Sequence, residues 1–108
     1  MRMGDDLGKR LATYRRQRGL SAQKLADQSG GRITRFTIAA IESGRKKAPS
    51  MEEIGLLAAL LGVPPIALIL PLDRPYSRVE VTEDWSPTVA ELLHWFVGLD
   101  PARYTDGY

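Results

Sequence analysis

Residues 21–44 read SAQKLADQSGGRITRFTIAAIESG, and this stretch decides the fold. It contains two segments whose apolar spacing fits short helices, and each follows a hydroxyl residue that can cap a helix. Ser21 precedes the first segment, residues 22–29, and Thr34 precedes the second, which runs to Ser43. Gly30-Gly31 stands between them and suits the positive φ angles found at helix C-termini. The stretch therefore predicts two short helices joined by a glycine-containing turn.

The helical pattern continues on both sides of this stretch. Further helices are predicted over residues 5–17, over residues 51–61 after the capping box that begins at Ser50, over residues 66–70, and over an amphipathic segment that Ser86-Pro87 starts. Period-two alternation appears only at residues 78–81. The prediction is an all-α protein with a five-helix domain over residues 1–70. A linker and one amphipathic C-terminal helix, for packing or dimerisation, fill residues 71–108.

Composition limits the kinds of protein this chain can be. It has 108 residues, 44% of them hydrophobic, no cysteine and a single histidine, His94. Without thiols or a second imidazole we predict no metal site and no cofactor. No Ser/His/Asp order, phosphate loop or carboxylate pair stands out, so we do not expect an enzyme.

Neither export nor membrane insertion is predicted. Residues 56–72 carry no charge, but Gly62 and two prolines interrupt them, and a membrane span needs roughly 20 apolar residues. The N-terminus is acidic and is followed by no apolar stretch of a signal peptide. We therefore expect a cytoplasmic protein without a membrane partner.

Charge is divided unevenly along the chain. Residues 1–50 contain 12 Lys and Arg against 4 Asp and Glu, whereas residues 51–108 contain 3 against 9, within a net charge of +2. A basic half indicates a polyanionic partner for that part of the molecule.

Two short helices joined by a turn inside a five-helix array form the helix-turn-helix motif, whose second helix enters the DNA major groove. The residues in order are Leu7-Gly8-Lys9-Arg10-Leu11, Arg15, Gly19-Leu20-Ser21, Leu25-Ala26, Ile38, Ile41-Glu42-Ser43-Gly44-Arg45, Pro49-Ser50, Leu57-Ala58 and Leu61-Gly62-Val63. This pattern resembles the Cro/repressor-type (XRE) helix-turn-helix family over about residues 5–70. The resemblance implies a lambda-repressor-like fold and double-stranded DNA as partner. It also implies that Arg15 and Glu42 form an internal ion pair.

The face of the second helix opposite Ile38 and Ile41 is the predicted DNA surface. Arg35 either forks onto guanine O6 and N7 or contacts a phosphate. Phe36 either meets a thymine methyl or a sugar, or is buried if the helix is rotated. The candidate DNA-contacting residues are Ser21, Gln23, Lys24, Arg32, Thr34, Arg35, Phe36, Thr37, Ala39, Ala40, Ser43, Arg45, Lys46 and Lys47.

Two departures from the family pattern concern phosphate contacts. Ala22 stands where the family commonly has a glutamine, so Gln23 or Lys24 would have to replace that contact. The turn from Gly30 to Ile33 is about two residues longer than usual, which should push Arg32 outward to a backbone contact of its own.

The function predicted is a sequence-specific transcriptional regulator, a repressor that occupies an operator. The alternative is an antitoxin-like or other protein-binding module whose C-terminal part holds a protein partner or antagonist. Leu56, Leu60 and the last helix offer more apolar surface than the first domain needs, so that helix either folds back or pairs with a second copy. Of these two, we favour a homodimer.

Overall fold

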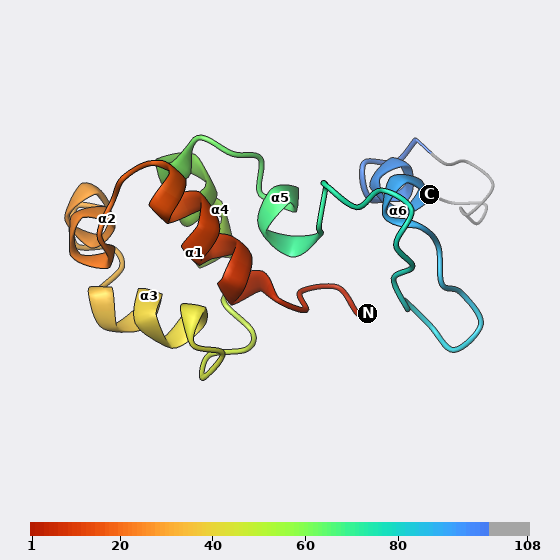
Figure 1. Ribbon diagram of the computed structural model, residues 1–108, viewed down its shortest axis with the longest axis horizontal. Helices are drawn as coiled ribbons and strands as arrows, with labels where there is room; N and C mark the ends of the chain where they lie inside the picture. The colour runs from red at the N-terminus through yellow and green to blue at the C-terminus, as the bar shows by residue number, and fades with distance from the viewer. Residues whose placement is uncertain (100–108) are drawn as a thin grey trace. The chain divides into compact units, whose positions relative to one another are not determined.

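A computed structural model describes residues 1–99 of the chain, and within them the helices follow the predicted order (Figure 1). They are α1 (Leu7–Gln17), α2 (Ala22–Gln28), α3 (Arg35–Glu42), α4 (Met51–Leu61), α5 (Ile66–Ile69) and α6 (Val89–Phe96). The all-α prediction is confirmed, and among residues 1–99 five helices precede residue 70 and one follows it.

The helices α2, α3 and α4 begin directly after the hydroxyl residues that the sequence analysis identified as caps. The side chain of Ser21 accepts a hydrogen bond from the backbone of Lys24, and that of Thr34 accepts one from Thr37. Ser50 and Glu53 form a complete capping box at α4. Each cap satisfies backbone N–H groups that have no partner inside the helix, which fixes the starting residue.

Two helix starts differ from the prediction. The first helix begins at Leu7 and not at residue 5, because Asp6 adopts a left-handed conformation with φ 60°. Thr88 caps the last helix, which therefore begins at Val89 and not directly at Ser86-Pro87. Residues 78–81 form no named strand within residues 1–99, since only isolated bridges such as Arg78 with Thr88 occur there.

The described backbone divides into two units, Gly4–Leu70 and a second unit that joins Met1–Met3 to the chain from Pro71 onward. Met1–Met3 were expected in the first domain. They belong to the second because the carbonyl of Met1 accepts a 2.7 Å hydrogen bond from the backbone N–H of Glu80.

The unit Gly4–Leu70 is organised around one apolar core to which all five of its helices contribute. The buried members are Leu7, Leu11, Leu25, Ala26, Ile33, Ile38, Ile41, Leu57, Ala58, Leu61 and Leu68. Leu56 and Leu60 are partly buried and pack against the same core. The apolar surface that they were expected to offer is therefore partly covered within this unit. Burying one such leucine completely contributes roughly 1.5–3 kcal/mol.

Gly8 brings α1 and α3 into backbone contact. A Cβ at this position would overlap the carbonyl oxygen of Ile41, so no residue larger than glycine fits the present geometry. This close approach places the C-terminal end of α3 firmly against α1.

The second unit has a small core of its own. Val79, Val89 and Leu92 are fully buried, and the rings of Trp85 and Trp95 meet edge to face with 5.0 Å between centroids. Nowhere in residues 1–99 does a helix have the length and apolar character needed to cross a membrane.

Candidate nucleic-acid interface

The surface of α3 divides as its sequence predicted. Ile38 and Ile41 are buried, whereas Arg35, Phe36, Ala39 and Ser43 are exposed. Thr37 and Ala40 are half-buried at the edges of this face. The exposed face therefore combines small residues in the middle of the helix with a cation and an aromatic ring at its start.

Phe36 faces solvent and is not turned into the core, with 68% of the residue exposed. The guanidinium carbon of Arg35 lies over its ring, 4.8 Å from the centroid. Beside them Thr34 caps the helix, and its hydroxyl lies 3.2 Å from that of Thr37. The start of α3 is thus a solvent-facing group of side chains in contact with one another.

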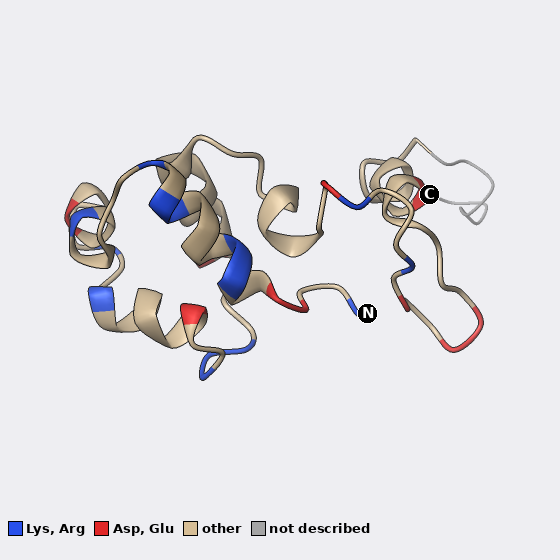
Figure 2. Cartoon of the chain, viewed as in Figure 1, with Lys and Arg blue, Asp and Glu red and all other residues tan. Residues whose placement is uncertain are grey.

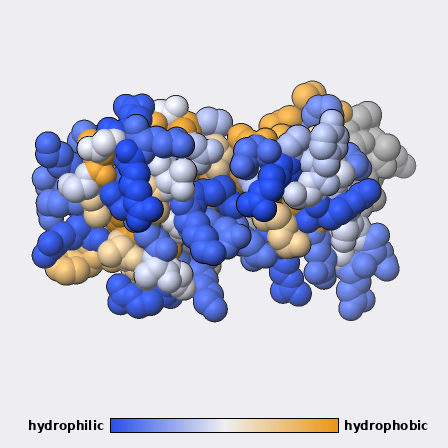
Figure 3. Space-filling model, viewed as in Figure 1, coloured by the Kyte–Doolittle hydropathy of each residue, from blue (hydrophilic) through white to orange (hydrophobic). Residues whose placement is uncertain are grey.

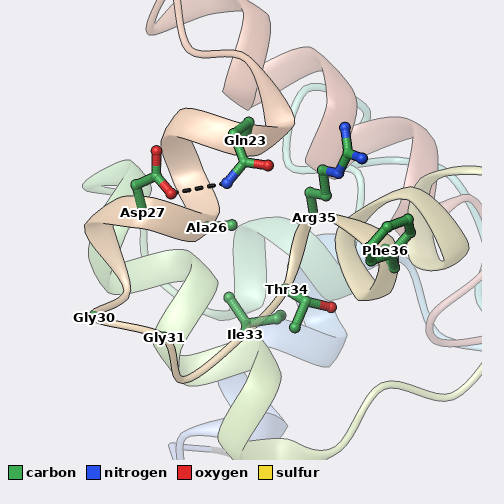
Figure 4. A pocket seen from close by; sticks show the side chains of 9 residues that line it. All are labelled: Gln23, Ala26, Asp27, Gly30, Gly31, Ile33, Thr34, Arg35 and Phe36. Atoms are coloured by element: carbon green, nitrogen blue, oxygen red, sulfur yellow. Dashed lines mark hydrogen bonds between the residues drawn. The ribbon is translucent and has the colours of Figure 1, made fainter.

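A hollow of about 410 Å³ opens between α2 and the start of α3 (Figure 4). Its walls include Gln23 and Asp27 on α2, with Arg35 and Phe36 across from them. The side-chain amide of Gln23 donates a 2.8 Å hydrogen bond to the carboxylate of Asp27. One donor of Gln23, a candidate for the missing phosphate contact, is therefore already occupied. Lys24 is exposed near the same helix start.

Arg32 extends from the turn before α3 and forms an ion pair with Glu52. Its guanidinium lies 2.9 Å from Oε1 of Glu52, the second residue of α4, with side chains 61% and 77% exposed. Ion pairs this exposed contribute about 0–1 kcal/mol, so the contact is easily exchanged for another anion.

The loop after α3 carries the remaining candidate cations. Arg45 and Lys47 are exposed, and Nε of Arg45 lies 3.4 Å from the hydroxyl of Ser43. Lys46 is different, because its ammonium lies 2.8 Å from Glu53, whose side chain is only 20% exposed. This contact with Lys46, together with the backbone of Ser50, holds the pKa of Glu53 below its usual range.

Arg15 and Glu42 form the ion pair that the family resemblance implied. Two parallel hydrogen bonds of 2.8 Å join them, and the side chains are 13% and 14% exposed. The guanidinium also donates to the carbonyl of Leu20. Hydrogen bonding to Glu42 raises the pKa of Arg15 against the opposing effect of burial, so the pair stays charged and fixes α1 to the end of α3.

Sequence reasoning missed the acidic partners of three candidate DNA-contacting residues: Asp27, which accepts a hydrogen bond from Gln23, and Glu52 and Glu53, which pair with Arg32 and Lys46. Glu53 was recognised as part of a capping box, but not as the partner of Lys46. Glu52 gave no sequence signal as a partner of Arg32, because the pair joins residues 20 apart across α3.

Lys and Arg gather around α3, as Figure 2 shows for its first turn and for the loop that follows it. Acidic residues interrupt this basic surface at positions where each is paired with a cation. The surface presented by the start of α3 and the following loop is therefore cationic with local counter-charges.

Two helices joined by a glycine-containing turn, with the second helix exposed along one face, define a helix-turn-helix domain. The sequence pattern of the helix-turn-helix family matches residues 11–68, more than half of the chain. The chain therefore belongs to this family, of the XRE type.

Among solved structures, the DNA-binding domain of BldD is similar, with 30% identity and a TM-score of 0.55. The match covers 62% of this chain and 93% of that domain. None of the curated proteins matches the sequence of this chain.

An enzyme also contains a similar domain. Hydroxypropylphosphonic acid epoxidase from S. wedmorenis matches with 25% identity and a TM-score of 0.56, over 70% of this chain and 37% of the epoxidase. The complex of FeII HppE with substrate matches equally, with 25% identity and a TM-score of 0.56, over 69% of this chain and 40% of the enzyme. The likeness therefore covers well under half of the enzyme.

Proposed function

We propose that this protein is a sequence-specific double-stranded DNA-binding regulator of transcription, a repressor that occupies an operator through α3. The observation that carries the proposal is the exposed face of α3, with Arg35 and Phe36 at its start and small side chains along it. Small residues let a helix approach the floor of the major groove, and an arginine can fork onto guanine there. The BldD domain, whose name states DNA binding, supports the same assignment.

Phosphate contacts surround this face in the proposal. Lys24 near the start of α2 and Arg45 and Lys47 after α3 are exposed and suited to the DNA backbone. Ser21 and Thr34 use their hydroxyls as caps and can bind a phosphate alongside. Lys46 is assigned a smaller role, since Glu53 holds its ammonium.

The test is the salt dependence of binding to random duplex DNA. With about four or five phosphates neutralised per protomer, log K should fall with log salt at a slope near −4. Arg35→Ala should lower affinity for a selected site by about tenfold or more. Arg74→Ala, which removes an exposed cation in the second unit, should leave affinity unchanged. A flat salt response of the wild-type protein would refute the proposal.

The protein is proposed to act as a homodimer without catalytic activity, in the cytoplasm. Dimers of this motif read two half-sites about 34–36 Å apart, so a selected operator should be a palindrome with that spacing. Sedimentation over a range of protein concentrations tests the dimer directly.

A second candidate function is a protein-binding module of the antitoxin type. It is favoured by the exposed apolar residues Phe96, Val97 and Leu99 at the end of α6, over which Figure 3 shows hydrophobic surface. Under this alternative a partner would bind the second unit, and DNA binding would be weak or absent. Tight binding to a co-purified protein with a flat salt response on DNA would favour it.

A further inference from the structure

Arg35 and Phe36 form an exposed pair of side chains at the start of α3. The guanidinium of Arg35 lies over the Phe36 ring, and both residues are exposed. Within residues 1–99 the guanidinium forms no hydrogen bond or ion pair, in contrast to Arg15 and Arg32. Its donors are therefore free, while its position is restrained by the ring.

We propose that Arg35 and Phe36 act as one reading unit for two adjacent base pairs. Arg35 binds a guanine, and Phe36 contacts the methyl group of a neighbouring thymine. This inference rests on the proposed function, because it requires α3 to lie in the major groove. It goes further in naming a base step, a thymine next to a guanine, as the sequence that this end of the helix selects.

The geometry of the two side chains leads to this step. A guanidinium that forks onto O6 and N7 of guanine lies close to the plane of that base. The guanidinium carbon lies over the face of the Phe36 ring, 4.8 Å from its centroid. With this stack kept in the complex, the ring is displaced from the plane of the guanine by about one base-pair step, since stacked pairs in B-DNA are roughly 3.4 Å apart. The ring therefore meets the edge of the adjacent base pair.

The chemistry of the base edges then selects thymine. In the major groove only thymine presents a methyl group, at C5, where cytosine has a smaller C–H, and the purine edges present hydrogen-bonding atoms. A phenyl ring placed against those atoms would remove them from water without offering a partner, which is unfavourable. Phe36 therefore favours thymine and disfavours the other bases at this position.

The middle of α3 allows both side chains to reach the bases. Ala39 is exposed and Ala40 is half-buried, so no long side chain holds the helix away from the groove. The stack also keeps Arg35 ordered before binding, and so reduces the conformational entropy lost when it contacts guanine. The ring is thus expected to help guanine recognition as well as to read thymine.

The experiment begins with selection of bound duplexes from random DNA by the full chain. In the selected duplex, thymines beside a guanine are replaced singly by uracil, which lacks the methyl, and guanines by 7-deazaguanine, which lacks N7. The wild-type protein should bind the uracil duplex about three- to fivefold more weakly at one such position. It should bind the 7-deazaguanine duplex about tenfold more weakly at the neighbouring one.

Three variants separate the two halves of the unit. Phe36→Ala should bind the thymine and uracil duplexes equally and lose part of its discrimination for guanine. Phe36→Leu should still distinguish thymine from uracil. Arg35→Lys should bind the guanine duplex more weakly and show a smaller effect of 7-deazaguanine while keeping the salt slope, because lysine keeps the charge but not the planar fork. Phe36 is exposed, and an unchanged thermal unfolding midpoint confirms that each variant is folded.

Two results would overturn the inference while leaving the proposed function intact. In one, the selected site contains no thymine beside a contacted guanine. In the other, Phe36→Ala still binds the uracil duplex more weakly than the thymine duplex, by the same factor as the wild-type protein. A chain that enriches no sequence at all, and binds random duplex without salt dependence, overturns both the inference and the proposed function.

Discussion

At the C-terminal end of α3, Glu42 is enclosed by its own domain, whereas at the N-terminal end Arg35 and Phe36 stand in solvent. The enclosed end is held by a bidentate ion pair to α1 and by the backbone contact at Gly8. The open end is held by a cap at Thr34 and by the exposed pair between Arg32 and Glu52. One helix is thus anchored firmly at one end and presents exchangeable contacts at the other.

This contrast indicates which substitutions should change stability and which should change DNA binding. Substitutions at the enclosed end should cost stability, because they disturb a buried contact that has no substitute. Substitutions at the open end should leave stability nearly unchanged and alter binding to DNA, because their present partners are weak.

The largest effect is expected at Gly8. Gly8→Ala places a Cβ against the carbonyl of Ile41, so α1 and α3 must separate, at a cost of about 3 kcal/mol in unfolding free energy. Gly55→Ala is the matched control, since its Cβ would meet no atom within 4 Å inside α4. It should stabilise the protein by about 0.5–1 kcal/mol. Urea denaturation of both variants checks the difference, and an equal effect of the two would contradict the close contact.

The next effect is expected at Glu42. Glu42→Gln keeps the shape but leaves the guanidinium of Arg15 without its counter-charge, at 13% exposure. Complete burial would cost about 3–5 kcal/mol, and the remaining solvent access lowers the expectation to about 2 kcal/mol. The same substitution at Glu52 is the control, because its pair with Arg32 is exposed. The asymmetry between the two ends would be disproved if both variants lost the same stability.

Glu53 should give an intermediate effect with a characteristic pH dependence. The hydrogen bond from Lys46, followed by that from Ser50, lowers the pKa of Glu53 in the folded protein. The contribution of ionised Glu53 to the unfolding free energy is therefore complete above the ordinary glutamate pKa, about 4.3. It is lost as the pH falls through the lower pKa that Glu53 has in the folded protein.

Glu53→Gln should accordingly lose about 1 kcal/mol at pH 7, where the charge contact with Lys46 is removed, while the glutamine amide oxygen can still accept the capping-box hydrogen bond from Ser50. The difference from the wild-type protein should shrink as unfolding is measured at successively lower pH, from 7 toward 3. A difference that stays constant over this range would show that the charge of Glu53 contributes nothing.

The two ends also differ in how far they could be predicted from the sequence. The starts of α2, α3 and α4 follow from local hydrogen bonding, because Ser21, Thr34 and Ser50 each bond to a residue three positions later. Apolar spacing assigned Ile38 and Ile41 to the core for the same reason, since the helix period is a local property. The pairing of Arg15 with Glu42 came from the family resemblance and not from spacing.

What escaped prediction depends on how the chain turns between helices. The contact of Arg32 with Glu52 spans α3 and the following loop, so no local pattern marks it. The orientation of Phe36 was left open because one residue of error in helix phase rotates a side chain by about 100°. The side-chain amide of Gln23 is exposed and has several possible partners, so the sequence does not indicate its hydrogen bond to Asp27. Arg32, Phe36 and Gln23 lie near the open end, where few packing constraints act, whereas the missed contact of Lys46 with Glu53 follows the enclosed end.

The smallest effect on stability is expected at Glu52, where a substitution should strengthen DNA binding. Glu52→Gln should change the unfolding free energy by no more than about 0.5 kcal/mol, since the pair with Arg32 is exposed. If the proposed function holds, the freed guanidinium can bind a phosphate, so affinity for random duplex should rise about three- to tenfold. The salt slope should steepen by up to about 0.9.

Arg32→Ala supplies the background that tests this reasoning. In that background Glu52→Gln should raise affinity much less, because the carboxylate no longer has a guanidinium to withhold from DNA. An equal rise in both backgrounds would mean that Glu52 acts only through net charge, and the exchangeable contact at the open end of α3 would have no role in binding. A rise confined to the background that retains Arg32 would instead show that this end of the helix gives up an internal partner to gain an external one, which the enclosed end at Glu42 cannot do.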